Sequence, residues 1–518
     1  MTRDRPRNYY VQQRDRPLKR LRKLCSRLPK PDWLAAAWVL DRGRGNKNFQ
    51  QPPGFNYPQQ YLTASISEPG AIHGWEIETL TTECLACSIR PGPRVLNVRS
   101  WPAITQLVDL LREVGNAETG LTEPEEVLRN MRRILSQQLP WQIHHHTVED
   151  YVRWWFIFKS ETLQSIFLER TGVSFRKFCL MGLAWALVLK ENPYVKYPTA
   201  ERALGLTEGD IKAFVKATST SLERAIAGAK EIVATGAEID FRKSNLRQRP
   251  VIMVGDNDQF ICPLWQLFLW RITSGLYYDV VADVKAPHEI GKMYEEYTLE
   301  LLRAVSVGLE ISGEINYGTA KQPKLSPDCI VHRQGTVEML VECKAKKLPQ
   351  VAQHSMVDTK ERADSIRELS KGIVQLCRFE KALKQSAVAK FSGTDQIAFL
   401  LVTLDDFIFT GPDITEAVFD GAAEIASNAG EHFERIERKD VALCTATELD
   451  ELCSRYSFED IKRICAASTQ DRFKEYALVN IAQEGFKNER HPDDYPLTHL
   501  MDELCRVDGL DAAALVEP

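Results

Sequence analysis

The chain of 518 residues lacks any hydrophobic run long enough to cross a bilayer. Its longest apolar stretches, residues 179–189 and 260–270, reach about half of the roughly 20 residues that a membrane helix needs. Nothing in the sequence resembles a secretory leader. We therefore expect a protein without membrane contact, in which both stretches are helices or strands of a buried core.

The cysteines do not form a disulfide framework. All 12 are scattered over the chain, many of them inside apolar runs where a free thiol behaves as a small hydrophobic side chain. This usage is typical of the reducing cytosol and predicts a cytoplasmic protein. Cys84 and Cys87 have the spacing of zinc ligands, with His73 nearby, but no second cysteine pair lies at a suitable distance. Two buried structural thiols are the favoured interpretation, and a zinc site is the alternative.

Three other patterns carry little chemistry by themselves. Adjacent histidines at 144–146 cannot all share one face of a helix, which favours a polar loop or a helix start. The acidic stretch 256–258 lacks the remaining ligands of a calcium loop, so it predicts a turn. Aromatic residues within 151–158 could stack on bases, but their helical spacing favours packing in a core.

The composition is that of a folded protein with an uneven charge. Apolar residues make up 44% and charged residues 26% of the chain, which is ordinary for globular proteins. Residues 1–47 contain 14 Arg or Lys and 4 Asp, so the overall charge of −5 divides into +10 in this segment and −15 elsewhere. Such a segment either attracts polyanions such as nucleic acid or is a solvated tail.

Hydrophobic periodicity predicts a multidomain α plus α/β protein. Apolar residues recur at spacings of three and four through residues 101–235, which indicates packed amphipathic helices, with Thr207 as one helix N-cap. Beyond residue 286 helices and strands alternate, which predicts an α/β domain with a central mixed sheet. The expected parts are a basic arm and linker (1–60), a mostly helical module of unknown role (61–240), a junction with a β-hairpin (241–285), the α/β domain (286–450) and a C-terminal helical segment (451–518).

Two short β-type runs in residues 326–347 end in charged residues. Alternation along the second run puts Leu340, Glu342 and Lys344 on one face. The polar residues between the runs predict an antiparallel hairpin, which can place Asp328 beside Glu342. Adjacent carboxylates repel unless a cation lies between them, and oxygen ligands favour Mg²⁺ or Mn²⁺. A neighbouring ammonium can orient a metal-bound water and offset charge on a phosphate, an arrangement suited to phosphodiester hydrolysis.

These residues resemble the motif of the PD-(D/E)XK nuclease superfamily, which has the restriction-endonuclease-like fold. Pro327-Asp328 matches the first half of the motif, and Glu342-Cys343-Lys344 matches the second. The resemblance implies that Asp328 and Glu342 bind Mg²⁺, which Mn²⁺ could replace, and that Lys344 positions or activates the attacking water. It covers residues 286–410, about a quarter of the chain.

Two flanking segments extend the resemblance. In this superfamily the helix before the first core strand often carries an acid in a G-x-x-(aromatic)-E pattern, which the sequence from Gly291 to Glu295 fits. The resemblance therefore makes Glu295 the expected third metal ligand, with Glu296 and Glu289 as alternatives.

Some members carry Gln-x-x-x-Tyr on the helix after the lysine strand. Gln375 begins a similar pattern here, but Phe379 replaces the tyrosine and lacks the hydroxyl that those members use. Lys346 and Lys347 extend the lysine strand with positive charge, and we expect them to contact phosphate rather than only solvent.

A second match elsewhere in the chain shows that the residue pattern of the motif has little specificity without its structural context. Pro412-Asp413 followed by Glu437-Arg438-Lys439 also satisfies the pattern. The apolar spacing between these two parts is helical, so a strand that carries Glu437 beside Asp413 is not expected. We interpret this match as a decoy, because a motif counts only where its structural context agrees.

The resemblance implies a Mg²⁺-dependent deoxyribonuclease, expected to be an endonuclease. DNA is preferred over RNA because most relatives act on DNA, and a role in restriction or antiviral defence rests on analogy of fold alone. The alternatives are a scaffold or nucleic-acid-binding protein that keeps the fold without cleaving, and an RNA-directed nuclease. Two cuts on opposite strands need two sites, which makes a homodimer a reasonable expectation. A partner protein that activates or targets the enzyme is a separate expectation.

Overall fold

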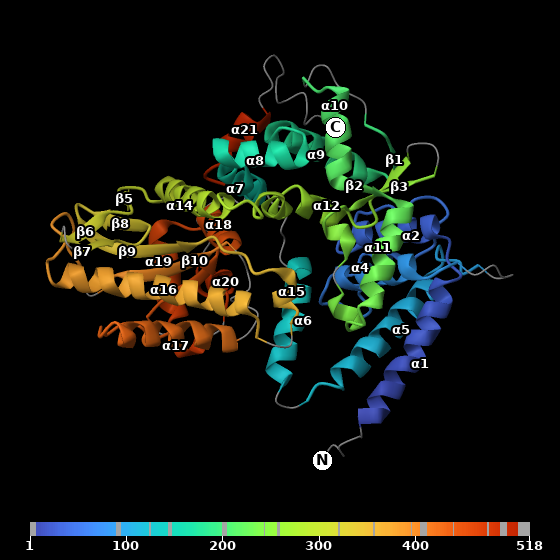
Figure 1. Ribbon diagram of the computed structural model, residues 1–518, viewed down its shortest axis with the longest axis horizontal. Coiled ribbons are helices and arrows are strands. Elements are labelled where there is room, and N and C mark those ends of the chain that lie inside the picture. Colours follow the sequence, from blue (N-terminus) through green and yellow to red (C-terminus); the bar gives the residue numbers. More distant parts are fainter. Residues whose placement is uncertain are drawn as a thin grey trace. The chain divides into compact units, whose positions relative to one another are not determined.

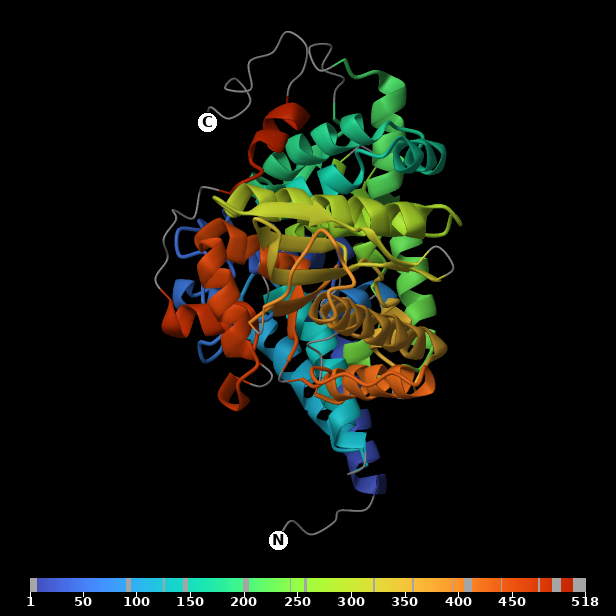
Figure 2. The same ribbon diagram turned by 90° about the vertical axis from the view of Figure 1, so that its left-hand side faces the viewer.

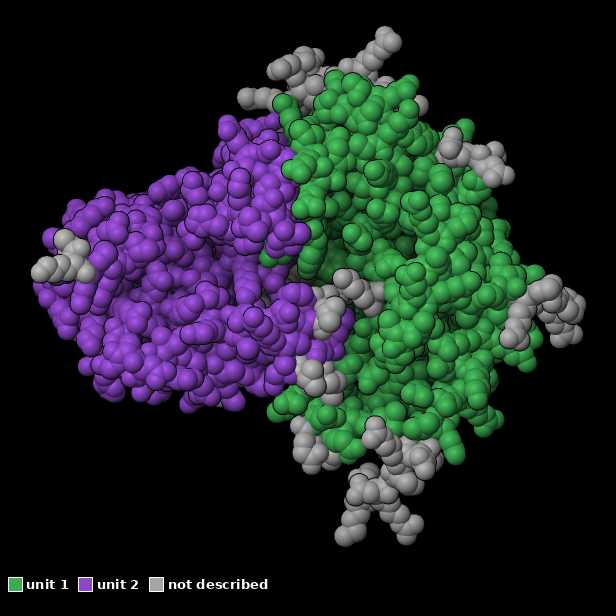
Figure 3. All heavy atoms as spheres, in the orientation of Figure 1, with its two compact units in different colours: residues 1–146, 167–279 green, residues 147–166, 280–518 purple. Residues whose placement is uncertain are grey.

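The structure is a computed structural model (Figures 1 and 2), and its residues group into two compact units. Unit 1 contains residues 1–146 and 167–279, and unit 2 contains residues 147–166 and 280–518 (Figure 3). The residues that the structure describes are 7–89, 95–123, 126–142, 148–198, 205–242, 244–255, 259–319, 322–355, 358–394, 396–404, 412–438, 440–473, 476–486 and 495–505. The general expectation of a helical N-terminal part and a C-terminal α/β part with a mixed sheet is confirmed.

Unit 1 is mainly helical and carries a small mixed sheet. In this sheet, of order β1-β4-β3-β2, strands β3 and β4 pair antiparallel, which is the hairpin predicted at the junction, while β2 pairs parallel with β3. The helices are α1 (Arg7–Cys25), α2 (Lys30–Gly43), α3 (Gln59–Leu62), α4 (Gly74–Ala86), α5 (Trp101–Thr119), α6 (Val127–Gln142), α9 (Phe175–Glu191), α10 (Glu208–Thr218), α11 (Leu222–Ala234) and α12 (Trp265–Arg271), and the strands are β1 (Tyr194–Lys196), β2 (Ser219–Ser221), β3 (Val251–Val254) and β4 (Gln259–Ile261). Two further helices, α8 (Glu161–Thr171) and α13 (Tyr277–Val280), include residues of both units.

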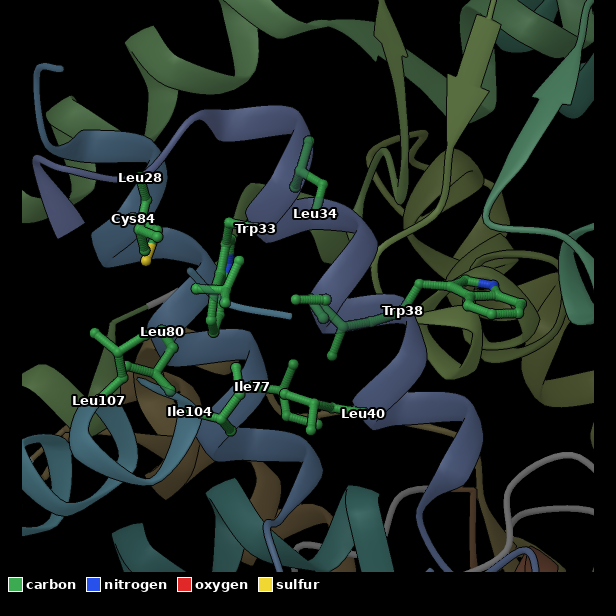
Figure 4. Close-up of a cluster of buried hydrophobic side chains, with 14 of the residues drawn as sticks. Leu28, Trp33, Leu34, Trp38, Leu40, Ile77, Leu80, Cys84, Ile104 and Leu107 are labelled. Carbon is green, nitrogen blue, oxygen red and sulfur yellow. The ribbon is translucent and has the colours of Figure 1, made fainter. Parts of the chain in front are cut away.

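The basic N-terminal segment differs from the expected arm and linker. Helix α1 packs along α5, and Leu21 and Cys25 on α1 are buried. Most of α2 is buried as well, including Trp33 and Trp38 in the main core of unit 1 (Figure 4). The many arginines and lysines conceal an apolar stripe at helical spacing, and burying that stripe stabilises the helices more than composition suggests.

One local prediction in unit 1 is confirmed at the level of hydrogen bonds. The Thr207 side chain caps α10 by accepting a hydrogen bond from the backbone N–H of Asp210. The carboxylate of Asp210 in turn accepts one from the backbone N–H of Thr207. Such a reciprocal capping box satisfies backbone donors that the first helical turn leaves free.

Unit 2 is built on a five-stranded mixed sheet of order β11-β10-β9-β8-β5. Strands β9, β10 and β11 run parallel, whereas β8 is antiparallel to both β9 and β5. The strands are β5 (Glu310–Gly313), β8 (Cys329–Arg333), β9 (Thr336–Lys344), β10 (Ala398–Thr403) and β11 (Ala442–Thr445), and a separate hairpin consists of β6 (Asn316–Thr319) and β7 (Gln322–Leu325). Between β8 and β9, Gln334 and Gly335 have φ of 49° and 82°, the left-handed conformation that a tight two-residue hairpin requires.

Helices cover both faces of this sheet. Figures 1 and 2 show α14 on one face and α16 with α17 on the other, and α16 and α17 share a buried core with the strand residues that face them. The helices of unit 2 are α7 (Val148–Ile157), α14 (Ala286–Val305), α15 (Gln350–Gln353), α16 (Lys360–Lys384), α17 (Pro412–Asn428), α18 (Ala446–Arg455), α19 (Phe458–Ser468), α20 (Leu478–Gly485) and α21 (His499–Cys505).

Helix α7 belongs to unit 2, although its sequence lies inside the predicted helical module. Arg153 on α7 is buried between Asp150 and Asp450 and forms ion pairs with both. Tyr297 on α14 donates its hydroxyl proton to the same Asp450, at 2.5 Å. A buried arginine needs such partners because an unpaired charge in a low-dielectric interior is costly.

Among the described residues, no single helix is both long and apolar enough to cross a membrane. Helices α8 and α9 meet the length and composition criteria only as a pair, and this pair is bent by 65°.

Candidate active site

The β8–β9 hairpin brings Asp328 and Glu342 together. Cys329, the first residue of β8, pairs with Val341 on β9. Because Asp328 precedes Cys329 and Glu342 follows Val341, the two acids are neighbours across the strands. Asp328 Oδ2 also accepts a hydrogen bond of 2.7 Å from the backbone N–H of Cys343. That bond fixes the side chain of Asp328 at the end of the Glu342 strand.

Glu342 and Lys344 share the face of β9 that α16 covers. Lys344 Nζ donates to Glu342 Oε1 at 2.6 Å, and Glu342 is only 1% exposed. The second oxygen of this carboxylate, Oε2, is buried and has no hydrogen-bond partner among the described residues. A buried, unpaired carboxylate oxygen is costly and requires an explanation. A bound cation would provide one.

The acids of this site hold their protons more tightly than ordinary carboxylates. Burial raises the pKa of Glu342 to about 8, against the opposing charge of Lys344 and with the help of Asp328. Burial also raises the pKa of Asp328, while Lys344 and the N–H of Cys343 lower it. For Lys344, burial lowers the pKa, but Glu342 and Asp328 outweigh burial and raise it overall. Lys344 is therefore an ammonium at neutral pH.

Glu295 on α14 is the third acid of the site, and it interacts electrostatically with Asp328 and Lys344. Burial and then Asp328 raise the pKa of Glu295 to about 7, and Lys344 lowers it. The two alternatives have other partners, since Glu289 accepts a hydrogen bond from Ser160 at 2.6 Å and Glu296 lies 3.9 Å from Lys292. Of the three candidates on α14, Glu295 is the one whose carboxylate interacts with Asp328.

Glu314 is a fourth acid, and the sequence analysis missed it. It lies between β5 and β6, and its pKa is raised by burial and then by Asp328, while Lys344 lowers it. No motif contains this residue. Glu314 directly follows β5, and its interaction with Asp328 arises only in the folded sheet.

Gln375 on α16 contacts the backbone just before Asp328. Its side-chain amide donates to the backbone carbonyl of Ser326 at 2.7 Å. The Ser326 hydroxyl accepts from the N–H of Ile315 and donates to the carbonyl of Pro327, both at 2.9 Å. Gln375 thus holds the turn that leads into Asp328. Phe379 is fully buried in the core, in keeping with its lack of a hydroxyl.

Gly372 lets α16 approach the site closely, and the sequence analysis missed it too. A Cβ at this position would lie 2.9 Å from Leu401 Cδ1 and 3.1 Å from both Glu342 Cγ and Lys344 Cε. A separation under 3.0 Å forces neighbouring atoms to move. The absent side chain therefore allows α16 to cover the Glu342–Lys344 pair directly.

The remaining basic residues of the motif region separate into two environments. Lys346 is exposed, whereas the Lys347 ammonium lies 5.0 Å from the centre of the Trp154 ring. Trp154 itself is buried, as are Phe156 and Phe158, so most of this aromatic cluster is core rather than a stacking surface.

The second motif match has no strand context. Asp413 lies in the first turn of α17, and Glu437 lies in a loop, while Lys439 is outside the described residues. Neither Asp413 nor Glu437 lies on a strand, which agrees with the helical spacing of the residues between them.

Of the other sequence patterns considered for metal binding, only the cysteine pair lies in the described part of the chain. Cys84 is buried and Cys87 is partly exposed, and both are free thiols. Residues 144–146 and 256–258 are outside the described residues. Within the described ranges, no three His, Cys, Asp or Glu side chains are grouped so as to hold a metal ion.

The acids of the candidate site fit Mg²⁺ or Mn²⁺ by their chemistry. Asp328, Glu342, Glu295 and Glu314 supply oxygen ligands of the type that these ions prefer, and the unpaired Glu342 Oε2 would gain a partner. Their present spacing, however, is not that of a preformed metal cradle. One oxygen of Glu342 is occupied by the Lys344 ammonium.

Comparisons with known proteins yield no relative for this chain. No family model matches it, and no significant match was found among curated proteins or among solved structures. A functional proposal therefore depends on the residues of the site and on their geometry.

Proposed function

We propose that unit 2 is a metal-dependent nuclease domain that hydrolyses phosphodiester bonds, with DNA as the expected substrate. The observation that carries the proposal is the meeting of Asp328, Glu342 and Lys344 at the ends of β8 and β9, with Glu295 acting on them from α14. Such a concentration of acids with raised pKa values around one lysine is typical of a functional site. Unit 2 is also a mixed sheet covered by helices, as the resemblance to PD-(D/E)XK nucleases implies.

Each residue has a distinct role in this proposal. Asp328, Glu342 and Glu295 would hold Mg²⁺, which would polarise a phosphate oxygen and acidify a water molecule. Asp328 is held in place by the N–H of Cys343. Lys344 stays protonated because Glu342 and Asp328 raise its pKa. It therefore orients water and stabilises negative charge on the phosphate, rather than accepting a proton.

A cleavage assay with matched variants tests the proposal. Wild type, Asp328→Asn and Lys344→Ala are incubated with supercoiled plasmid, linear duplex, single-stranded DNA and RNA, each with Mg²⁺ and with EDTA. We expect wild type to cleave in Mg²⁺ but not in EDTA, and we expect neither variant to cleave. Lys212→Ala serves as the control because Lys212 is an exposed lysine on α10 of unit 1. Equal cleavage by wild type and Asp328→Asn would contradict the assignment.

A protein that binds nucleic acid without cutting it is the second candidate. The observation in its favour is the Lys344–Glu342 ion pair, which occupies an oxygen that a metal ion would need. Fluorescence anisotropy and the cleavage assay together separate the two functions. For a binding-only protein, anisotropy should show the same affinity in wild type and Asp328→Asn, with the steep salt dependence of phosphate contacts. The cleavage assay should show no product with DNA or RNA.

A further inference from the structure

A pocket with a volume of about 210 Å³ lies wholly within unit 1. Its lining residues come from α4, β2, α11 and the segment 244–249, which includes the short 3-10 helix η4 (Asn245–Arg247). Helices α4 and α11 pack against each other in this unit (Figure 1). Sites for drug-sized molecules usually measure about 300–1,000 Å³, so this pocket suits a single compact ligand.

The floor of the pocket is apolar. It consists of Leu85 on α4, Ala225 and Ala229 on α11, and Leu246 on η4, all of which are buried. The two alanines are four residues apart, so they share one face of α11. Their small side chains leave room for a flat ring to lie close to the helix, and apolar contacts of this kind provide much of the affinity in ligand pockets.

Uncharged polar side chains adjoin the floor. Asn245 and Gln248 are exposed amides, and Thr220 on β2 carries a partly exposed hydroxyl. Within the described part of the chain, these three side chains have no hydrogen-bond partner. A Cβ at Gly228 would overlap the amide nitrogen of Asn245, so the glycine lets this amide lie against α11. An amide offers both a donor and an acceptor, which can pair with the edge of a nucleobase.

Arg224 and Arg249 add two positive charges to the lining. Among the described residues, neither guanidinium forms an ion pair with a carboxylate. Arg247, two residues before Arg249, is different because it pairs with Glu78 through hydrogen bonds of 2.7 and 2.8 Å. A guanidinium matches phosphate oxygens with paired N–H donors. Two guanidinium groups that are not engaged by acids can therefore hold a phosphate group.

The acids around the pocket do not cancel these charges. The described residues that line it include no Asp or Glu. On α4, the acids nearest in sequence to the lining residue Thr82 are Glu78 and Glu83, which form ion pairs with Arg247 and Arg242. Because these two acids already have cationic partners, the local field favours an anionic ligand over a cationic one.

We propose that this pocket binds a mononucleotide. Arg224 and Arg249 hold its phosphate group, and its base lies on the face that Ala225 and Ala229 share. Asn245 hydrogen-bonds to the edge of the base. The ligand site uses no residue of unit 2, so it does not depend on the proposed nuclease chemistry.

Isothermal titration calorimetry of the intact chain in EDTA tests the pocket. The probes are AMP, GMP, CMP and UMP, and the tightest of them is compared with its own nucleoside and with inorganic phosphate. We expect at least one mononucleotide to bind, and its nucleoside and inorganic phosphate to bind at least about tenfold more weakly, because each lacks part of the contacts. Arg224→Ala and Arg249→Ala should each weaken mononucleotide binding by at least about tenfold.

Two control variants locate the binding. Arg176→Ala removes an exposed arginine of α9 that does not line the pocket, and it should bind the mononucleotide as wild type does. Asp328→Asn changes the proposed active site in unit 2 and should also bind as wild type. Neither Arg224 nor Arg249 is buried, so their variants should unfold at the temperature of wild type, and thermal unfolding checks this.

Three outcomes would overturn the proposal. In the first, none of the four mononucleotides binds to wild type at millimolar concentration. In the second, the nucleoside binds as tightly as its mononucleotide, so the phosphate is not recognised. In the third, the double variant Arg224→Ala/Arg249→Ala binds the mononucleotide as tightly as wild type. Loss of plasmid cleavage in any assay would leave this result untouched, because calorimetry in EDTA measures binding alone.

Discussion

At the scale of single residues, the charge balance of the candidate site depends on Lys344. Its ammonium pairs with Glu342, and its charge opposes the rise in the pKa values of Asp328, Glu342 and Glu295. Four neighbouring acids with a single ammonium leave an excess of negative charge in a partly buried place, which disfavours the folded state unless protons or cations bind. A cation-requiring site is the simplest function for such an arrangement.

Gln375 gives a prediction for a residue that positions others. Its amide holds the carbonyl of Ser326 and so the approach to Asp328. Gln375→Ala is expected to lower kcat by about tenfold with little change in KM, because the contact supports geometry rather than substrate binding. Steady-state cleavage kinetics measure both constants. Gln375→Glu keeps an acceptor but loses the donor, so it should resemble Gln375→Ala, and a wild-type kcat in both variants would contradict this role.

Asp240 in unit 1 gives a prediction for the pH dependence of stability. Burial, followed by the charges of Glu76 and Glu238, raises the pKa of Asp240 to about 7, above its value of about 3.9 in an unfolded chain. The folded chain therefore binds this proton more tightly, and the stabilisation that results is complete below about pH 4 and lost as the pH rises through about 7. In Asp240→Asn this loss should disappear.

Urea unfolding of unit 1 at several pH values checks the Asp240 prediction. Between about pH 5 and pH 8, the free energy of unfolding should fall by about 1–3 kcal/mol more in wild type than in Asp240→Asn. Asp109→Asn changes an exposed acid of α5 and should follow wild type. If the free energy of unfolding fell more steeply with pH in Asp240→Asn than in wild type, the predicted rise in the pKa of Asp240 on folding would be contradicted.

At the scale of elements, the contact between α16 and β9 positions the site. Gly372→Ala would place a methyl group 2.9 Å from Leu401 and 3.1 Å from atoms of Glu342 and Lys344. The buried side chain of Leu401 must then move, and overpacking of this kind costs about 1–3 kcal/mol. We expect lower stability and a loss of cleavage activity, measured by thermal unfolding and by plasmid cleavage.

Gly291→Ala is the matched control for the α16 prediction. Gly291 lies inside α14, and a Cβ there meets no atom within 4 Å. Because alanine favours a helix over glycine by about 0.5–1 kcal/mol, this variant should be slightly more stable than wild type. Equal effects of the two substitutions would show that close packing of α16 is not the cause.

The strands and the hairpin of the site could be predicted from the sequence, but their supports could not. Alternation along β9 identifies the shared face of Glu342 and Lys344, and the polar residues before β9 identify the hairpin. Glu314 and Gly372 are distant in sequence from the motif, and only tertiary packing brings them to it. Periodicity describes a single element, so it does not reveal which residues of other elements approach it.

At the scale of the whole molecule, the two units do not follow the order of the chain. Residues 147–166 belong to unit 2, where Arg153 forms buried ion pairs with Asp150 and Asp450. The sequence analysis grouped this segment with the helical module because its periodicity matches that of its neighbours. A helix's own pattern shows that it buries one face, but not against which partner.

Arg153→Met tests this long-range connection within the intact chain. Loss of the arginine leaves two buried acids without their cation, which typically costs about 3–5 kcal/mol. We expect faster hydrogen exchange in β9 and β10 and a loss of cleavage activity, although Arg153 is far from the motif in sequence. Lys159→Met, which removes an exposed lysine just after α7, should leave exchange unchanged. Unaltered exchange in Arg153→Met would contradict the role of α7 in unit 2.

Conversion of supercoiled plasmid by wild type and by Lys344→Ala in Mg²⁺ is the most decisive measurement for the proposed active site. We expect nicked or linear product with wild type, none with EDTA, and at least about a hundredfold less product with Lys344→Ala. Lys344→Ala must bind the plasmid as wild type does, so that the loss is one of chemistry. Equal cleavage by Lys344→Ala and wild type would show that this lysine and its carboxylates are not the active site.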